Sequence, residues 1–272
     1  MYICRKCGEK LVLSERSYRC ANGHCYDLSS AGYVNLLMSG KSGIHGDSKE
    51  MLTCRRSFLS GGYYYPIILR LTQLITERYP EKRALTLLDA GCGEGYYTDA
   101  LRAMLEQNGY SVSIFGIDVS KDGVMMAAKR YKGCNFAVAS VNALPFPAES
   151  FDVVISLFAP IAESEFGRIL KGDGMLITVS PSPKHLYGLK SAIYDDPYEN
   201  EETTFAPGIL VPIGKSMVED RIELTSSDEI TALFTMTPYY HKTSEVGKNK
   251  VKALEKLDTE IGFMFYTFGR KQ

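Results

Sequence analysis

The chain lacks any apolar run that could cross a membrane. None of its apolar stretches approaches the ~20 residues that a spanning helix needs, and the first six residues lack the apolar centre of a secretory signal. Repeats and low-complexity tracts are also missing. With 45% hydrophobic and 23% charged residues, the 272-residue chain has the composition of a globular protein. We expect it in the cytoplasm, with no membrane contact.

A large charge excess of either sign is also missing, since the net charge is −1. The charges are nevertheless unevenly distributed. Residues 1–60 hold nine Lys or Arg and five Asp or Glu, so this segment carries +4 and the remainder −5. A basic front end on an acidic body suggests contact with a polyanion. A chance excess on a short segment is the alternative.

Cysteine is scarce and odd in number, with seven residues, so a disulfide framework is not expected. Two close pairs, Cys4 with Cys7 and Cys20 with His24, instead supply four soft ligands. They predict a closed, structural Zn²⁺ site, which would let a unit too small for its own core fold. Cys25 is an alternative fourth ligand to His24, and free surface cysteines are the non-metal alternative.

A glycine-rich turn follows the apolar run 85–88, which reads as a buried strand. The turn has the pattern Asp89-x-Gly91-x-Gly93-x-Gly95, and the next helix begins near residue 96. Glycines let the backbone approach a ligand closely, and the helix directs its first amides at that ligand. Asp118 ends the next apolar run, where a carboxylate can accept hydrogen bonds from ribose hydroxyls.

This spacing resembles the first motif of the class I S-adenosylmethionine-dependent methyltransferases. A dinucleotide fingerprint would place its third glycine one residue later, which argues against a dinucleotide. NAD is nevertheless the main rival cofactor. An ordinary glycine-rich turn is the structural alternative. Downstream, strand and helix patterns alternate, which predicts a parallel sheet covered on both faces. The expected strands are 85–88, 113–117, 135–139, 152–157, 175–180 and 261–268.

The remaining segments organise the chain into three parts. We predict a zinc-ribbon domain for RNA recognition over 1–35, a linker and helix over 36–66, and a methyltransferase domain over 67–272. Residues 36–50 read as a flexible linker, and 195–210 as an acidic loop. The expected helices are 49–60, 67–78, 97–107, 122–131, 162–170, 185–193 and 228–235.

Ribbon, linker and cofactor domain, in this order, resemble the bacterial 23S ribosomal RNA (guanine-N1)-methyltransferase family over nearly the whole chain. The ribbon ligands match that family, and so do segments on both sides of the glycine turn. The matching segments are 32–37, 46–51, 55–59, 89–98, 116–121, 128–131, 144–146, 159–160, 183–186 and 236–238. The resemblance implies a doubly wound, mostly parallel seven-stranded sheet with a small N-terminal zinc ribbon.

The resemblance also implies what the site binds. S-adenosylmethionine would be the methyl donor, the zinc would be structural, and the substrate would be N1 of a guanine in a 23S rRNA hairpin loop. A homodimer is a further implication. The cofactor-binding residues would be Tyr64, Asp89, Gly91, Gly93, Glu94, Gly95, Asp118, Asn142 and His185. Packing is an equally good interpretation of Tyr64, and a plain surface position of His185.

No general base can be named from the sequence. Glu163 and Glu165 lie close to the expected pocket, but pairing with Arg168 is the favoured role of Glu165. Phe158 and Pro160, after the fourth strand, could stack on the target base or simply pack the strand end. The amide that amino-methylating enzymes carry in this stretch is missing, which argues against amino methylation.

Basic residues of the front end would hold the RNA backbone through salt-dependent contacts. They are Arg5, Lys6, Arg16, Arg19, Arg55 and Arg56. Two other functions are compatible with the same motifs. One is a methyltransferase of a small molecule or protein, with the ribbon as a docking module. The other is an RNA-binding protein that keeps the cofactor fold without catalysis.

Overall fold

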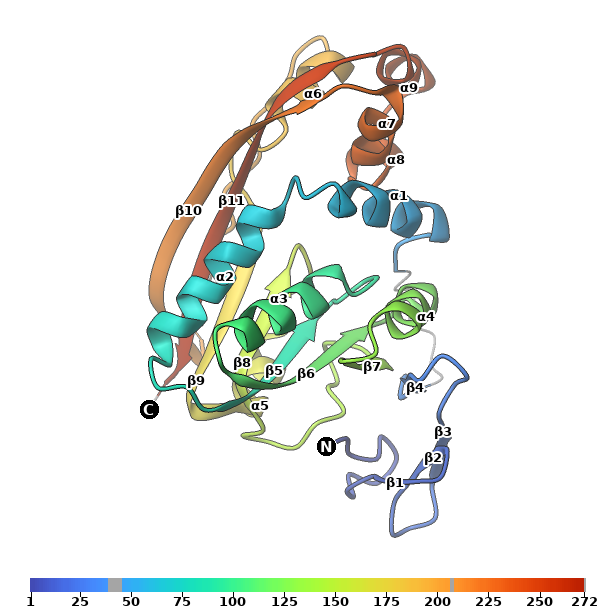
Figure 1. The fold of residues 1–272 in the computed structure, drawn as a ribbon, viewed down its shortest axis with the longest axis vertical. Helices are drawn as coiled ribbons and strands as arrows, with labels where there is room; N and C mark the ends of the chain where they lie inside the picture. Colours follow the sequence, from blue (N-terminus) through green and yellow to red (C-terminus); the bar gives the residue numbers. More distant parts are fainter. Residues whose placement is uncertain (39–45, 206–207, 272) are drawn as a thin grey trace.

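The protein is built on one eight-stranded sheet and a separate three-stranded ribbon (Figure 1). This computed structural model describes residues 1–38, 46–205 and 208–271. The order in the large sheet is β10-β11-β9-β8-β5-β6-β7-β4. Its strands are β4 (Val34–Asn35), β5 (Ala84–Ala90), β6 (Ser111–Asp118), β7 (Asn135–Val138), β8 (Phe151–Leu157), β9 (Leu170–Pro181), β10 (Leu210–Leu224) and β11 (Leu257–Arg270).

The strands from β4 to β9 are parallel, whereas β11 runs antiparallel to both of its neighbours. This confirms the expected doubly wound, mostly parallel sheet. Seven strands come from the segment after residue 67, which is the number that the family resemblance implies. The eighth, β4, comes from the end of the predicted ribbon domain, where Val34 pairs with Ala137 and Asn35 with Val138. The division of the chain at residues 35 and 66 stays a prediction.

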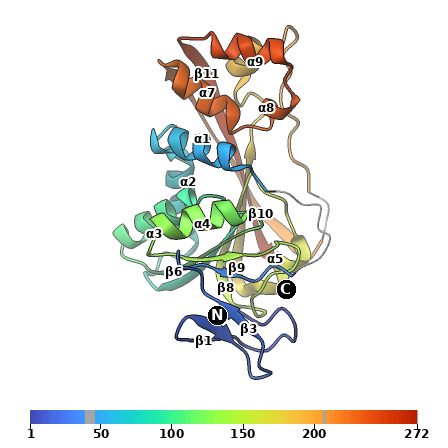
Figure 2. The same cartoon turned by 90° about the vertical axis from the view of Figure 1, so that its right-hand side faces the viewer.

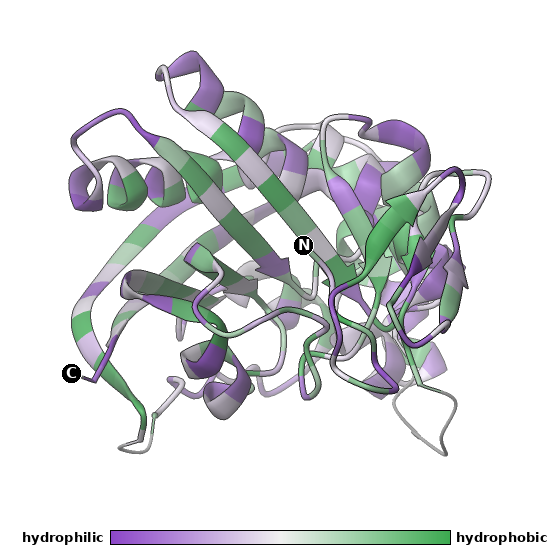
Figure 3. Ribbon diagram, turned by 90° about the horizontal axis from the view of Figure 1, so that it is seen from below, coloured by the Kyte–Doolittle hydropathy of each residue, from purple (hydrophilic) through white to green (hydrophobic). Residues whose placement is uncertain are grey.

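Helices cover one face of the sheet, while the ribbon and a short helix cover the other (Figures 1 and 2). Burial on both faces explains why β8 is apolar along almost its whole length. Apolar residues concentrate in the strands, and hydrophilic residues on the outer helices (Figure 3). The helices of this part are α2 (Tyr65–Arg78), α3 (Tyr96–Gln107), α4 (Lys121–Arg130) and α5 (Glu163–Ile169).

Strands β10 and β11 form a long antiparallel pair that extends beyond the parallel strands, and four helices gather at its far end (Figures 1 and 2). They are α6 (Tyr187–Ile193), α7 (Ser227–Thr235), α8 (Tyr239–Lys242) and α9 (Glu245–Lys252). Helix α1 (Lys49–Ser60) packs beneath them, against α7. It begins at Lys49, as predicted. The Ser48 hydroxyl caps this end by accepting a hydrogen bond from the Met51 N–H. Strand β10 and helices α8 and α9 were not predicted.

Two predicted irregular segments extend beyond the described residues. Residues 39–45 of the predicted linker and residues 206–207 of the predicted acidic loop lie outside the described residues. The rest of the acidic loop, residues 195–205, forms neither helix nor strand. Among the described residues, no helix is both long and apolar enough to cross a bilayer.

The ribbon is docked on the sheet through its second residue. Its strands are β1 (Val12–Ser14), β2 (Ser17–Arg19) and β3 (Cys25–Asp27). The Tyr2 side chain, 2% exposed, packs against both Phe115 and Phe146, with ring centroids 5.7 and 5.3 Å away. The neighbouring Ile3 N–H donates to the Pro145 carbonyl at 2.9 Å. An aromatic ring therefore joins the ribbon to the core of the large domain.

Tyr2→Ala should loosen the ribbon, because deleting a buried aromatic ring costs about 3–5 kcal/mol. We expect faster proteolytic cleavage within residues 1–35 and a lower free energy of unfolding in urea. Tyr2→Phe is the matched control, since the hydroxyl has no hydrogen-bond partner among the described residues. It should behave like the native protein. Equal cleavage rates for all three proteins would show that this ring does not hold the ribbon.

Candidate functional site

The four predicted zinc ligands converge on one point of the ribbon. The ligand atoms of Cys4, Cys7, Cys20 and His24 all lie within 4.8 Å of one another. Cys7 Sγ is 3.7 Å from Cys20 Sγ, and His24 Nδ1 is 3.5 and 3.4 Å from the sulfurs of Cys4 and Cys20. In tetrahedral zinc coordination, sulfur–sulfur edges are about 3.8 Å and sulfur–nitrogen edges about 3.6 Å. The donor set and its spacing therefore fit a closed zinc site.

The alternative ligand, Cys25, lies outside this cluster. Its exposed thiol is directed at Asp27, with Sγ 3.7 Å from the carboxylate oxygen. Strand β3 begins at Cys25, and the geometry of the turn before it places His24 Nδ1 toward the other three ligands. Tyr26, the next residue on β3, lies with its hydroxyl 3.3 Å from Cys4 Sγ. The tyrosine thus contacts a zinc ligand.

Cys7→Ser should abolish zinc binding, whereas Cys25→Ser should leave the zinc content unchanged. The reason is that only the first substitution removes a ligand of a closed tetrahedral site. Zinc per protein chain, measured by elemental analysis of the purified variants, distinguishes the two. Retention of zinc by Cys7→Ser together with its loss from Cys25→Ser would refute this ligand set.

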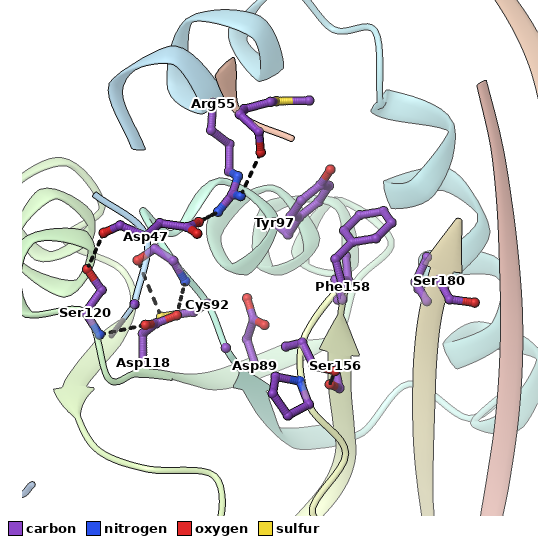
Figure 4. Close-up of a pocket in the computed structure, with 18 of the residues that line it drawn as sticks. Asp47, Arg55, Asp89, Cys92, Tyr97, Asp118, Ser120, Ser156, Phe158 and Ser180 are labelled. Carbon is purple, nitrogen blue, oxygen red and sulfur yellow. Dashed lines mark hydrogen bonds and ion pairs between the residues drawn. The ribbon is translucent and has the colours of Figure 1, made fainter. Parts of the chain in front are cut away.

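A cavity of about 660 Å³ lies above the carboxyl ends of the parallel strands. The floor comes from the ends of β5, β6, β8 and β9, and α1 contributes Met51, Leu52, Arg55 and Leu59 to the wall above it. Ligand sites of doubly wound sheets occur at this edge. Figure 4 shows Asp118 and Ser120 on one side of the cavity, Asp89 in the middle, and Ser156, Phe158 and Ser180 on the other side.

The glycine turn bends closely around the strand end. Gly91, Gly93 and Gly95 all have positive φ, at 92°, 53° and 86°. A Cβ at Gly91 would lie 2.5 Å from the Ala159 Cβ, and one at Gly95 would lie 2.7 Å from the Ala127 Cβ. Side chains are thus excluded both by backbone conformation and by space. Gly91 and Gly93 line the cavity, but Gly95 caps α3 and packs away from it.

Asp118 is held by the turn that it faces. Its two carboxylate oxygens accept hydrogen bonds from the Gly93 N–H at 2.9 Å and the Ser120 N–H at 2.7 Å. The Ser120 hydroxyl also donates to the Asp47 carbonyl at 3.3 Å, which brings the segment before α1 to the same side of the cavity (Figure 4). The carboxylate is therefore fixed in orientation, and each oxygen keeps further acceptor capacity.

Asp89 lies deeper and is 2% exposed. The Thr98 hydroxyl donates to its Oδ2 at 2.5 Å, and no cation pairs with it in the described part of the chain. Burial raises the pKa of this carboxyl to about 7, and the Thr98 hydrogen bond lowers it only in part. Glu94 is equally buried, but it forms an ion pair with Arg56 at 3.0 Å.

His185 and Tyr64 form a buried pair at the cavity wall. Burial lowers the pKa of His185 to about 3, so its ring is neutral. Nδ1 accepts the Gly262 N–H at 3.2 Å, so the ring proton is on Nε2, which lies 3.1 Å from the Tyr64 hydroxyl. That nitrogen must donate, and the phenol's own hydrogen is left available to another acceptor. A surface position for His185 is excluded, because it is 6% exposed.

Eight of the nine predicted cofactor-site residues line this one cavity, and Gly95 alone does not. Asn142 is exposed at the rim. Residues of α1 and of the segment before it were missed as cavity residues. Arg55 pairs with Asp47 and donates to the Met236 carbonyl at 3.3 Å, inside the cavity (Figure 4). Charged residues on a helix usually face solvent, so the sequence offered no sign of this inward direction.

Arg55 and Arg56, which were expected to hold RNA, each form an ion pair beside the glycine turn, with side chains 29% and 27% exposed, so their contact with RNA stays a prediction. The two acidic residues of α5 are structural. Glu165 pairs with Arg168 at 2.7 Å, as favoured from the sequence, and accepts the Leu144 N–H at 2.6 Å. Glu163 accepts the Leu210 N–H at 3.0 Å.

Comparison with known proteins agrees with this architecture. Residues 2–39 match the zinc-ribbon family described as "RlmA, N-terminal", and residues 87–174 match the family described as "Methyltransferase domain". The chain therefore combines a segment that matches a methyltransferase domain with a segment that matches an RlmA-type zinc ribbon. The fold class, the zinc ribbon and the resemblance that the sequence suggested are thereby confirmed.

Three of its curated relatives carry the name 23S rRNA (guanine-N1)-methyltransferase, two of them as a provisional assignment. A Bacillus subtilis protein is 38% identical over 70% of this chain and 64% of its own length. A Micromonospora griseorubida protein is 29% identical over 84% and 83%. The guanine-748 enzyme of Streptomyces fradiae is 31% identical over 70% and 66%. The chain thus spans just under two thirds of the first and third relatives.

The pKa of Asp89 predicts how binding of a cationic ligand depends on pH. With a pKa near 7, the carboxylate is mostly neutral at pH 6 and mostly ionised at pH 8. S-adenosylmethionine carries an ammonium and a sulfonium group, so its affinity should rise about tenfold between these pH values. Calorimetric titration measures this, with adenosine as the uncharged control. Equal affinities of S-adenosylmethionine at both pH values would show that Asp89 does not face the ligand's charge.

The same group makes stability pH-dependent. Because its folded pKa lies above its unfolded value of 3.8, folding favours the neutral form. This contribution to stability is complete below about pH 4 and is lost as the pH rises through the folded pKa near 7. At pH 8, Asp89→Asn should therefore have a free energy of unfolding in urea a few kcal/mol higher than that of the native protein, and at pH 4 it should show little gain.

Proposed function

We propose that this protein transfers a methyl group from S-adenosylmethionine to N1 of a guanine in a hairpin loop of 23S rRNA. One observation carries the proposal. A single cavity joins the glycine turn and Asp118 to an open side bounded by Phe158, and the zinc ribbon is docked on the same domain. The names of the curated relatives support the substrate. Such an enzyme would work in the cytoplasm, where ribosomal RNA is made.

The residues of the cavity suit the parts of the cofactor. Asp118 would accept hydrogen bonds from the ribose hydroxyls, and Asn142, at the rim, would face the adenine. Asp89 would bind the ammonium of the methionine part, whose charge offsets the cost of ionising a buried carboxyl. The Tyr64 hydroxyl, oriented by His185, would donate to an acceptor of the same ligand. The bound cofactor supplies an electrophilic methyl group on sulfur.

The target base must be removed from its stack. N1 of guanine lies on the Watson–Crick edge and carries a proton. As the N1–methyl bond forms, this proton is released and the sulfur–methyl bond breaks, which leaves S-adenosylhomocysteine. The base therefore has to be unpaired and placed in line with the methyl group. A hairpin loop presents such a base. Three of the four cavity carboxylates are engaged, Asp47 and Glu94 by arginines and Asp118 by two backbone N–H groups. That engagement suits binding and orientation.

The ribbon would hold the RNA backbone. Lys6, Arg16 and Arg19 are exposed, and none of them takes part in an ion pair within the described ranges. Arg5 is partly buried, and its guanidinium lies 3.5 Å from the Leu144 carbonyl, at the seam with the large domain. Basic side chains of the ribbon that form no ion pair favour the binding of a polyanion at this end of the molecule. Two copies of the chain, each with one ribbon, would form the dimer that the family resemblance implies.

The decisive experiment is methyl transfer from labelled S-adenosylmethionine to 23S rRNA, followed by digestion and identification of the nucleoside. We expect 1-methylguanosine. Asp118→Asn should lower kcat/KM for the cofactor about 10- to 100-fold, because it removes the charged acceptor for the ribose hydroxyls while keeping the size of the side chain. Glu165→Gln, remote from the cofactor side, is the matched control and should keep its affinity for S-adenosylmethionine.

A different result would redirect the assignment. If the RNA stays unlabelled while the protein binds S-adenosylmethionine, a small-molecule or protein substrate replaces the RNA, and the ribbon becomes a docking module. If labelled RNA yields a methylated nucleoside other than 1-methylguanosine, the proposed target atom is wrong.

A further inference from the structure

A row of hydroxyl groups lies on the side of the cavity away from Asp118. Ser156 near the end of β8 and Thr178 and Ser180 on β9 line the cavity, and Ser156 and Thr178 are 1% and 3% exposed. Within the described residues, Thr178 Oγ1 and Ser180 Oγ have no hydrogen-bond partner. Ser156 Oγ makes one long contact, 3.5 Å from the Ala159 carbonyl. Since Ser156 pairs with Thr178 across the two strands, the hydroxyls are neighbours on one face of the sheet.

These hydroxyls are costly to the fold. Burying a hydroxyl without a partner costs about 1–3 kcal/mol, and alanine or valine would fill the same positions without that penalty. The rest of this face of β9 shows the alternative, because Leu176 packs there into the apolar core. Polar groups that converge on a cavity at such a cost indicate a ligand with matching donors and acceptors.

The walls beside the row are apolar and partly aromatic. Phe158, at the end of β8, is 45% exposed and has a positive φ of 54°, which is unfavourable for a bulky residue. Its N–H donates to the Val179 carbonyl at 2.9 Å, which fixes the strained position. Pro160 and Phe205 also line the cavity. In Figure 4, Ser156 lies below the Phe158 ring, between Asp89 and Ser180.

A planar base with a mixed polar edge fits these surroundings. Aromatic and proline side chains stack on its faces, while hydroxyl groups both donate and accept. The edge of guanine that carries N1 has the O6 acceptor on one side and the 2-amino donor on the other. We propose that Ser156, Thr178 and Ser180 form the subsite that receives the target guanine and contacts O6 and the 2-amino group. This inference rests on the proposed function and specifies where its substrate lies.

The test uses the full-length protein and two RNA hairpins. One carries guanosine at the position methylated in the rRNA assay, and the other carries inosine, which lacks only the 2-amino group. Thr178→Val with Ser180→Ala removes two hydroxyls at nearly constant volume. We expect kcat/KM for the guanosine hairpin to fall about 10- to 100-fold, the preference for guanosine over inosine to shrink, and the affinity for S-adenosylmethionine to stay within twofold.

Two variants serve as controls. Ser182→Ala removes another buried hydroxyl without a partner, directly after β9, but Ser182 does not line the cavity, so the kinetics of this variant should equal those of the native protein. Thr178→Ser keeps the hydroxyl and should retain the guanosine preference. A lower unfolding midpoint of the double variant alone would not change the ratio of guanosine to inosine rates, so that ratio separates recognition from stability.

Three outcomes overturn the subsite. An unchanged guanosine-to-inosine ratio in the double variant would show that the hydroxyls do not contact the 2-amino edge, while the proposed function would stand. A parallel loss of S-adenosylmethionine affinity would assign them to the cofactor instead. If the native protein forms no 1-methylguanosine in RNA, the proposed function fails, and the guanine subsite fails with it.

Discussion

The buried ion pair between Glu94 and Arg56 determines where the cavity is closed. Glu94 belongs to the glycine turn and is 2% exposed, so an unpaired charge there would cost several kcal/mol. Its cation comes from α1, which therefore has to lie across the turn. Arg55, the neighbouring residue, is anchored to Asp47 and to the Met236 carbonyl. The wall of the cavity is thus positioned by charge pairing with its floor, and α7 and α8 rest on that wall.

Different physical forces organise the two sides of the cavity. The side that holds Asp118 is rigid, because backbone N–H groups and positive-φ glycines fix its carboxylate. The opposite side offers hydroxyl groups, which can both donate and accept hydrogen bonds, and aromatic faces. Asp89 stands between them with a pKa near 7. One cavity therefore combines a preorganised polar site with a second site of hydroxyl and aromatic groups, as transfer between two bound molecules requires.

Local patterns predicted much of this molecule. The alternation of strand and helix patterns predicted the parallel core. The cysteine spacing predicted the zinc cluster. The helical pattern predicted that α1 begins at Lys49. Of the antiparallel pair β10 and β11, only β11 was predicted, because β10 is a mostly exposed edge strand without a regular alternation of apolar residues. Arg55 and Arg56 were placed outside, since helical charges normally meet solvent. Only tertiary contacts with the glycine turn direct them inward.

Site residues followed the same division. Motif spacing indicated Asp89, Gly91, Gly93 and Asp118, because short-range backbone geometry determines a glycine turn. The family resemblance added the other four residues that line the cavity: Tyr64, Glu94, Asn142 and His185. Gly95 shares the motif but serves packing, since a Cβ at this position would lie only 2.7 Å from the Ala127 Cβ. The hydroxyls of β8 and β9 were not singled out, because serine and threonine in a strand carry no spacing that distinguishes a ligand contact from ordinary strand preference.

Strand β4 has a consequence for how the protein stays in solution. Only two residues long, it hydrogen-bonds along β7 and so occupies what would be a bare margin of the sheet. The opposite margin, β10, is protected differently, by charged residues such as Lys215, Glu219 and Arg221. Strand β7 has no such charges and depends on the segment that follows the ribbon. The ribbon's exit segment thus shields this edge of the sheet from pairing with a strand of another molecule, whatever the ribbon itself binds.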